Sequence, residues 1–214
     1  MKLKTLPIGQ SDFREIITRK QFYVDKSLLL KELLDSGSLV SLIVRPRRFG
    51  KTTNLSMIRY FFEKHPNLEN CAYLFQDLQL WKEGSEYTDH CGKYPVVFWT
   101  LKDIKESNWE NCVARIKIVL AEEYSRHSYL LSGDSVTGQS RVDFENIINR
   151  SADISVYKNA LKNLTGYLYN HYKQKVVVLI DEYDTPIHEA YERGYYTNIV
   201  DFLRAFLGTG LKDN

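Results

Sequence analysis

The chain has 214 residues, and its 29 lysines and arginines nearly balance its 27 aspartates and glutamates, giving a net charge of +2. This balance gives no argument for nucleic acid or acidic lipid as a partner, and the length suits one good core with at most a small appendage. The beginning of the chain lacks the apolar centre of a signal peptide, and no apolar run approaches the roughly 20 residues of a membrane span. We expect a soluble, cytoplasmic protein without a membrane partner.

The cysteines and histidines give no sign of a metal centre. Cys71, Cys91 and Cys112 are odd in number and lack the spacing of metal ligands, and the five histidines are dispersed along the chain. We expect the cysteines to pack as small apolar groups in a reducing compartment.

The first 38 residues predict two helices. The first begins near Ser11, and the second is rich in leucine and ends at Gly37. Between them lies an aromatic and β-branched stretch, which either forms a wall for an adenine base or seals the edge of the core. We therefore keep Tyr23 and Asp25 from this stretch as candidates for nucleotide binding.

The stretch from Leu39 to Met57, with the sequence LVSLIVRPRRFGKTTNLSM, predicts a buried strand, a turn and a helix that opens on Gly50. The positive end of that helix and the lysine ammonium attract phosphates, and the hydroxyl of Thr52 suits Mg²⁺. The sequence therefore predicts a loop for ATP or another nucleoside triphosphate. Its candidate contacts are Arg45, Pro46, Arg47, Arg48, Phe49, Gly50, Lys51, Thr52 and Thr53.

This loop departs from the usual phosphate-binding pattern. The glycine expected five residues before Gly50 is Arg45, so the loop must bend around phosphates with side chains attached. We expect a wider or more strained loop than the glycine-rich form. Arg47 and Arg48 either add charge toward the phosphates or form a solvated basic turn.

Alternating strands and helices are predicted between this loop and the end of the chain. They comprise an irregular stretch over 66–94, a strand over 94–101, a helix over about 109–124, a loop or insertion with one short helix over 132–155, a helix over about 157–172 and a last helix over about 197–207 ended by Gly208 and Gly210.

A second functional signal lies at Val176–Asp184, where the sequence is VVVLIDEYD. Five apolar residues predict a strand covered on both faces, and two acids follow at its carboxyl end, where open α/β sheets place ligands. Asp181 is placed to hold Mg²⁺ opposite Thr52, and Glu182 to orient and deprotonate an attacking water. Alternatively, Asp181 starts a turn or caps a helix.

The combination of LPIG, YVDKS, RPRRFGKTTNLSM, YPVVFWTLKDI and LIDEYDTPI closely resembles the predicted AAA-ATPase-like family over nearly the whole chain. The resemblance implies an α/β P-loop NTPase fold of three layers with a mainly parallel sheet, and ATP and Mg²⁺ as ligands. It also implies Lys51 and Glu182 as catalytic residues, Thr52 and Asp181 as metal ligands, and Arg45 as a normal part of the loop. Members typically join this domain to a carboxyl-terminal nuclease-like domain, which is absent from this chain.

The expected domain is single and spans 1–214. Its parts are a helical lead-in over 1–38, the loop and second strand over 39–131, the insertion over 132–155 and the acidic strand region over 156–214. In the ATPases that the chain resembles, a further strand lies between the loop strand and the acidic strand and follows the latter in sequence. We expect a truncated domain that lacks its last strands, and an open slot in its sheet would permit self-association.

Three functions fit these signals. The first is an ATPase that acts as a switch or motor for a downstream domain. The second is a module that binds a nucleotide without hydrolysing it and acts in regulation or beside nucleic acid. The third is a phosphotransferase, for which no motif of a substrate lid is evident.

Overall fold

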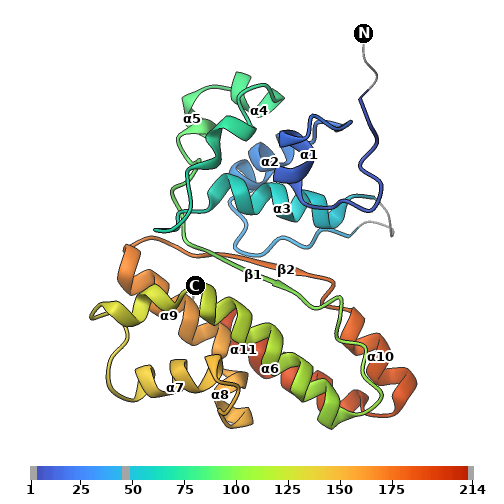
Figure 1. Ribbon diagram of the computed structural model, residues 1–214, viewed down its shortest axis with the longest axis vertical. Coiled ribbons are helices and arrows are strands. Elements are labelled where there is room, and N and C mark those ends of the chain that lie inside the picture. The colour runs from blue at the N-terminus through green and yellow to red at the C-terminus, as the bar shows by residue number, and fades with distance from the viewer. Residues whose placement is uncertain (1–3, 45–48, 212–214) are drawn as a thin grey trace. The chain divides into compact units, whose positions relative to one another are not determined.

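Residues 4–44 and 49–211 are described by the computed structural model, which divides into two units, Met1–Val96 and Val97–Asn214 (Figure 1). Strand β1 begins at the last residue of the first unit and otherwise belongs to the second. The first unit contains helices α1 (Phe13–Thr18), α2 (Leu28–Ser36), α3 (Lys51–Phe62), η1 (Cys71–Leu74), α4 (Gln79–Lys82) and α5 (Ser85–Thr88). The second contains β1 (Val96–Thr100), α6 (Trp109–Arg126), η2 (Ser128–Ser132), α7 (Gly138–Ile148), α8 (Ile154–Lys158), α9 (Ala160–Tyr172), β2 (Val177–Asp181), α10 (Thr185–Arg193) and α11 (Tyr196–Leu211).

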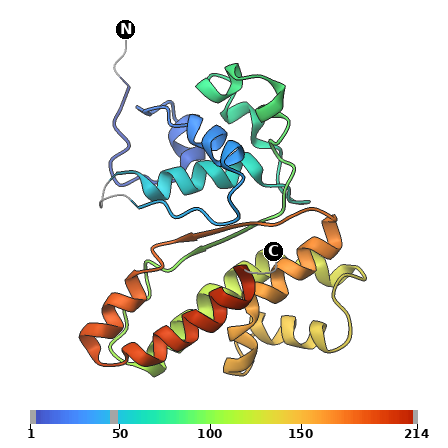
Figure 2. The same cartoon turned by 180° about the vertical axis from the view of Figure 1, so that it is seen from behind.

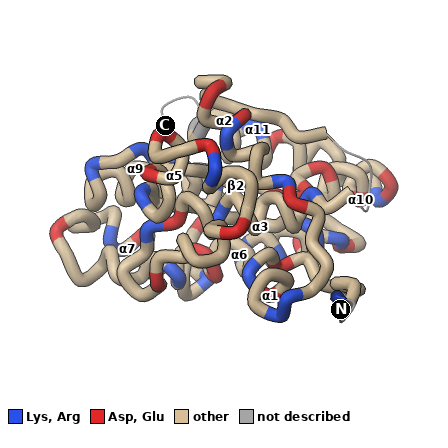
Figure 3. Tube along the Cα trace, turned by 90° about the horizontal axis from the view of Figure 1, so that it is seen from above, with Lys and Arg blue, Asp and Glu red and all other residues tan. Residues whose placement is uncertain are grey.

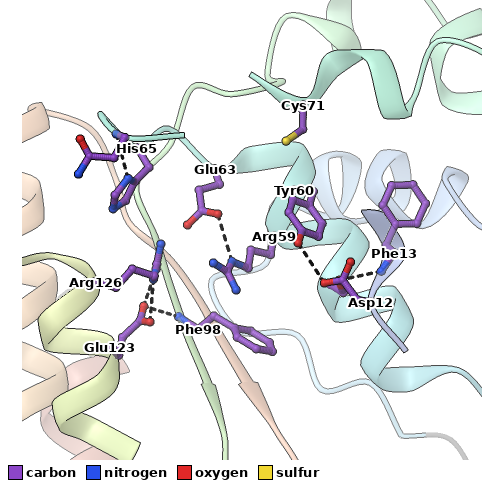
Figure 4. A network of polar contacts seen from close by, with 12 residues as sticks. Asp12, Phe13, Arg59, Tyr60, Glu63, His65, Cys71, Phe98, Glu123 and Arg126 are labelled. Atoms are coloured by element: carbon purple, nitrogen blue, oxygen red, sulfur yellow. Dashed lines mark hydrogen bonds and ion pairs between the residues drawn. The ribbon is translucent and has the colours of Figure 1, made fainter. Parts of the chain in front are cut away.

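The first unit is built around helix α3, against which α1 packs. The Asp12 carboxylate joins the two helices, because one oxygen caps α1 at the Glu15 N–H and the other accepts a bond from the Tyr60 hydroxyl at 3.0 Å (Figure 4). The rings of Phe13 and Phe75 lie 5.1 Å apart in the core beside them. Both predicted helices of the lead-in are present, and Gly37 ends α2 with φ of +58°.

The predicted strand over 39–44 is wrong for this structure. Residues 40–44 have no regular secondary structure, and Leu39, Val40, Leu42 and Val44 are exposed. A strand needs a neighbour for its N–H and C=O groups, and the one sheet among the described residues contains only β1 and β2. The apolar pattern that predicted this strand carries no information about whether a neighbouring strand is present.

The second unit carries the sheet. Strands β1 and β2 are parallel, and the Leu101 N–H donates to the Asp181 carbonyl at 2.9 Å just beyond the end of β1. The helices of this unit lie on one face of the sheet, as the views in Figures 1 and 2 agree. Val97 and Trp99 point into the core between sheet and helices, whereas α9 and α11 pack along each other. The predicted strands at 94–101 and 176–181 are thus confirmed in this unit.

The outer edge of β1 is occupied by a buried carboxylate. Because Leu101 bonds to β2, alternation along the strand turns the Phe98 N–H away from β2. That N–H donates to Glu123 of α6 at 2.9 Å, and Arg126 donates to the same carboxylate (Figure 4). His127 also donates to it. Burial opposes ionisation of Glu123, but the hydrogen bonds from Arg126 and His127 outweigh it and lower the pKa of the carboxyl group to about 2.

Two helices differ from their predictions. The stretch over 132–155 contains α7, an eleven-residue helix, in addition to the first two residues of α8. Helix α11 continues through Gly208 and Gly210, which were expected to end it. A Cβ at Gly210 would collide with the side chain of Leu161, so the glycine permits close packing of α11 on α9.

The predicted α/β class is confirmed. The two strands of the sheet do not establish the finer prediction of a three-layer P-loop fold. Lysines and arginines are interspersed with aspartates and glutamates along the trace (Figure 3). In the part of the chain that is described, no helix combines the length and apolar character needed to cross a bilayer.

Candidate functional site

The amino terminus of α3 carries the glycine, lysine and threonine that the sequence singled out. Gly50 is the N-cap residue, with φ of +74°, and Lys51 is the first residue of the helix. Positive φ is unstrained for glycine, which explains this residue type at the point where loop turns into helix. Lys51, Thr52 and Thr53 are half-buried there.

The start of α3 can be compared with the starts of α1 and α6. Helix α1 has a side-chain cap from Asp12 and an acid in its first turn, and α6 has a side-chain cap from Asn108 and an acid in its first turn. Helix α3 has neither a side-chain cap nor an acid in its first turn. Helices α2, α7, α8, α9 and α10 share this absence, so it does not distinguish α3. What distinguishes α3 is Gly50 as its N-cap followed by Lys51 as its first residue, which puts an ammonium group at the positive end of the helix and suits an external anion such as a phosphate.

The rest of the predicted loop is only partly visible. Arg45, Pro46, Arg47 and Arg48 lie outside the described residues. Phe49, which follows them, is 58% exposed. Its carbonyl accepts a hydrogen bond from Lys26, a residue that the sequence argument did not select.

Tyr23 and Asp25 have structural contacts in this unit. The Tyr23 hydroxyl lies 3.2 Å from the sulfur of Met57 in α3, and burial raises the pKa of Tyr23 to about 12. The Asp25 carboxylate accepts from the N–H groups of Ser27 at 2.8 Å and of Gln79 at 2.7 Å. These contacts hold Tyr23 and Asp25 within the first unit.

Exposed and half-buried residues alternate along the same segment. Phe22, Val24 and Lys26 are exposed, whereas Gln21, Tyr23 and Asp25 between them are half-buried. Alternation along an extended segment places Lys26 on the side opposite to Tyr23 and Asp25, but the residue types do not show which side is exposed, because the outward positions include the apolar Phe22 and Val24.

The two acids of the second unit end strand β2 and begin the turn after it. Asp181 is the last residue of β2 and is only 3% exposed. Glu182 follows with a carboxylate that accepts from the Thr185 hydroxyl at 3.2 Å. Its carbonyl accepts from the Thr185 N–H at 3.1 Å, which closes the turn into α10.

The backbone of Glu182 is in the left-handed region, with φ of +50°. This conformation costs an ordinary residue roughly 1–2 kcal/mol, and such positions are concentrated at functional sites. A glycine would adopt it without that cost. The residue selected from the sequence as a water-activating base is therefore held in a strained turn.

The residues present fit Mg²⁺ only as part of a nucleotide complex. The described residues include no group of three or more histidines, cysteines, aspartates or glutamates arranged to hold a metal ion. Mg²⁺ is usually held by one or two protein oxygens together with phosphates and water, rather than by a full protein cage. Within the first unit, Thr52 carries a hydroxyl oxygen of the kind that Mg²⁺ accepts beside a phosphate.

Comparison with known proteins gives one match. A family described as predicted AAA-ATPase matches residues 7–214, which include the start of α3 and both acids after β2. Searches of the curated proteins and of the solved structures found no match.

Proposed function

The chain belongs to the predicted AAA-ATPase family, and from that premise we propose that it binds ATP with Mg²⁺ and hydrolyses it. The observation that carries the proposal is the start of α3, where Gly50 with φ of +74° is the N-cap and Lys51 and Thr52 are the first two residues of the helix. An anion with several charges, such as a triphosphate, would complete that helix end.

Each residue has a distinct role in this proposal. The Lys51 ammonium binds the terminal phosphates, and the Thr52 hydroxyl and Asp181 carboxylate hold the metal. Bound Mg²⁺ would neutralise charge on the phosphate oxygens. The Glu182 carboxylate orients water and accepts its proton, and the Thr185 hydroxyl, 3.2 Å away, holds that carboxylate in place.

Hydrolysis would serve a conformational switch. Members of the family typically carry a further domain after this one, and we propose that the nucleotide state is transmitted to such a domain. The strained turn at Glu182 leads directly into α10, so a change at the carboxylate has a short path to a helix.

Binding is tested by thermal unfolding with and without Mg²⁺-ATP. At about a hundred times its dissociation constant the nucleotide should add about 2.7 kcal/mol to the free energy of unfolding of the parent chain. Lys51→Ala should lose this gain. Lys93→Ala, which removes the charge of an exposed lysine in the same unit, should keep it. A parent chain that gains no stability from the nucleotide would overturn the proposal.

Hydrolysis is tested with Glu182→Gln. This variant should bind Mg²⁺-ATP as tightly as the parent and release no phosphate above background. Turnover equal to that of the parent would exclude Glu182 as the base. Binding without turnover in the parent would instead support a nucleotide-binding module, and turnover only with an added acceptor would support a phosphotransferase.

A further inference from the structure

Lys26 lies at the phosphate loop although it is 25 residues before Lys51 in sequence. Its ammonium donates to the Phe49 carbonyl at 3.2 Å. The same nitrogen is 3.6 Å from the position that a Cβ on Gly50 would occupy. The charge therefore lies beside the last two residues before α3 begins.

The backbone on both sides of Lys26 is firmly held. Asp25 accepts from two backbone N–H groups, including that of Gln79 at the start of α4. Ser27 is fully buried and its hydroxyl accepts from the Leu80 N–H at 3.0 Å. With both neighbours fixed inward, alternation along the segment directs Lys26 outward to the loop.

The charge of Lys26 is not neutralised by a nearby acid. None of the ion pairs found among the described residues includes it, and the oxygens of the adjacent Asp25 each accept a backbone N–H instead. An ammonium held next to an uncapped helix start raises the positive potential there.

We propose that Lys26 is a positioning residue of the phosphate site. It fixes the end of the loop through the Phe49 carbonyl and adds a second ammonium to the field that a nucleoside triphosphate would meet. This role rests on the proposed nucleotide binding at Lys51 and Thr52. In this proposal, a segment that precedes the loop in sequence contributes to the affinity for phosphate.

The test compares Lys26→Met, Lys26→Arg and Lys93→Met in the full chain. Lys93 is an exposed lysine of the same unit, and its neighbour Gly92 bonds to Phe61 near the far end of α3. Mg²⁺-ATP affinity is measured by calorimetry at low and high salt. Hydrogen exchange of the peptide that contains Gly50 is measured without nucleotide.

Lys26→Met should weaken Mg²⁺-ATP binding about tenfold at low salt and by less at high salt, because screening reduces the contribution of an exposed charge. It should also speed exchange at Gly50 without changing the thermal midpoint of the nucleotide-free protein. Lys26→Arg should restore affinity to within about threefold, and Lys93→Met should match the parent.

Failure of this inference can be told apart from failure of the proposed function. Unchanged affinity in Lys26→Met, with a parent that binds and a Lys51→Ala variant that does not, would overturn the role of Lys26 alone. Equal losses in Lys26→Met and Lys93→Met would also overturn it, because they would reflect net charge only. A parent that does not bind Mg²⁺-ATP would overturn both proposals.

Discussion

The segment over 40–44 and strand β1 have similar apolar sequences and different structures. Val40 is 60% exposed, whereas Val97 of β1 is fully buried. Strand β1 has three supports: β2 beside it, a layer of helices against one face, and Glu123 at its outer edge. Among the described residues, the segment over 40–44 has no strand beside it.

The difference shows that strand formation depends on partners as much as on residue type. β-Branched residues favour a pleated surface, but the N–H and C=O groups still need a neighbour. An apolar, β-rich segment without one is also a hazard for aggregation. The following measurements test the edge of β1, compare β1 with the segment over 40–44, and test the turn after β2.

Acid should weaken the capped edge of β1. The pKa of Glu123 is lowered to about 2, below its ordinary value of 4.5, so its contribution to stability is present above pH about 4.5 and is lost as the pH falls toward 2. The loss should be on the order of 3 kcal/mol in the free energy of unfolding measured by urea denaturation. Glu123→Gln should lack this component and show a shallower fall over the same pH range, and an identical fall would contradict the assignment.

Matched valine substitutions should separate the two segments. Val97→Ala removes buried methyl groups from the core of the second unit and should cost about 2 kcal/mol of unfolding free energy. Val40→Ala should change the same quantity by less than about 0.5 kcal/mol, since that side chain is largely exposed. Similar losses in both variants, measured by urea denaturation, would show that residue 40 is buried in solution.

Relief of strain at the end of β2 should give the smallest effect. Glu182→Gly places glycine at φ of +50° and should raise the free energy of unfolding by about 0.5–1 kcal/mol. The same variant should lose ATP hydrolysis if Glu182 is the base. A destabilised variant would mean that the Thr185 hydrogen bond to the carboxylate outweighs the backbone strain.

Sequence was sufficient where the local pattern and the packing agree. Strand β2 is found as predicted, and its acids fall at the end of the strand and in the turn after it. Gly37 ends α2 because an αL residue closes a helix and glycine adopts that conformation without strain. The glycine, lysine and threonine of the loop are likewise at the start of α3.

The sequence was insufficient where contacts between residues far apart in the chain determine the structure. Helix α7 has a polar sequence that favours a loop, but the ring of Phe144 packs 4.7 Å from that of Tyr124 and anchors it to α6. Gly210 does not end α11, because it lies in a helix–helix contact where a larger residue would collide. Lys26 is positioned by its neighbours Asp25 and Ser27. Their side chains accept hydrogen bonds from the N–H groups of Gln79 and Leu80, which are more than fifty residues away in sequence.

The Glu123 carboxylate at the outer edge of β1 affects where a further strand could pair with the sheet. Because the Phe98 N–H already donates to Glu123, a further strand cannot pair with β1 at that position. The backbone groups of Val178 and Ile180 face the opposite side of β2, since the Asp181 carbonyl bonds toward β1 and alternate residues face opposite ways. Engineers who graft a strand beside β1 must therefore displace the Glu123 carboxylate, whereas a strand grafted beside β2 would pair with the N–H and C=O groups of Val178 and Ile180.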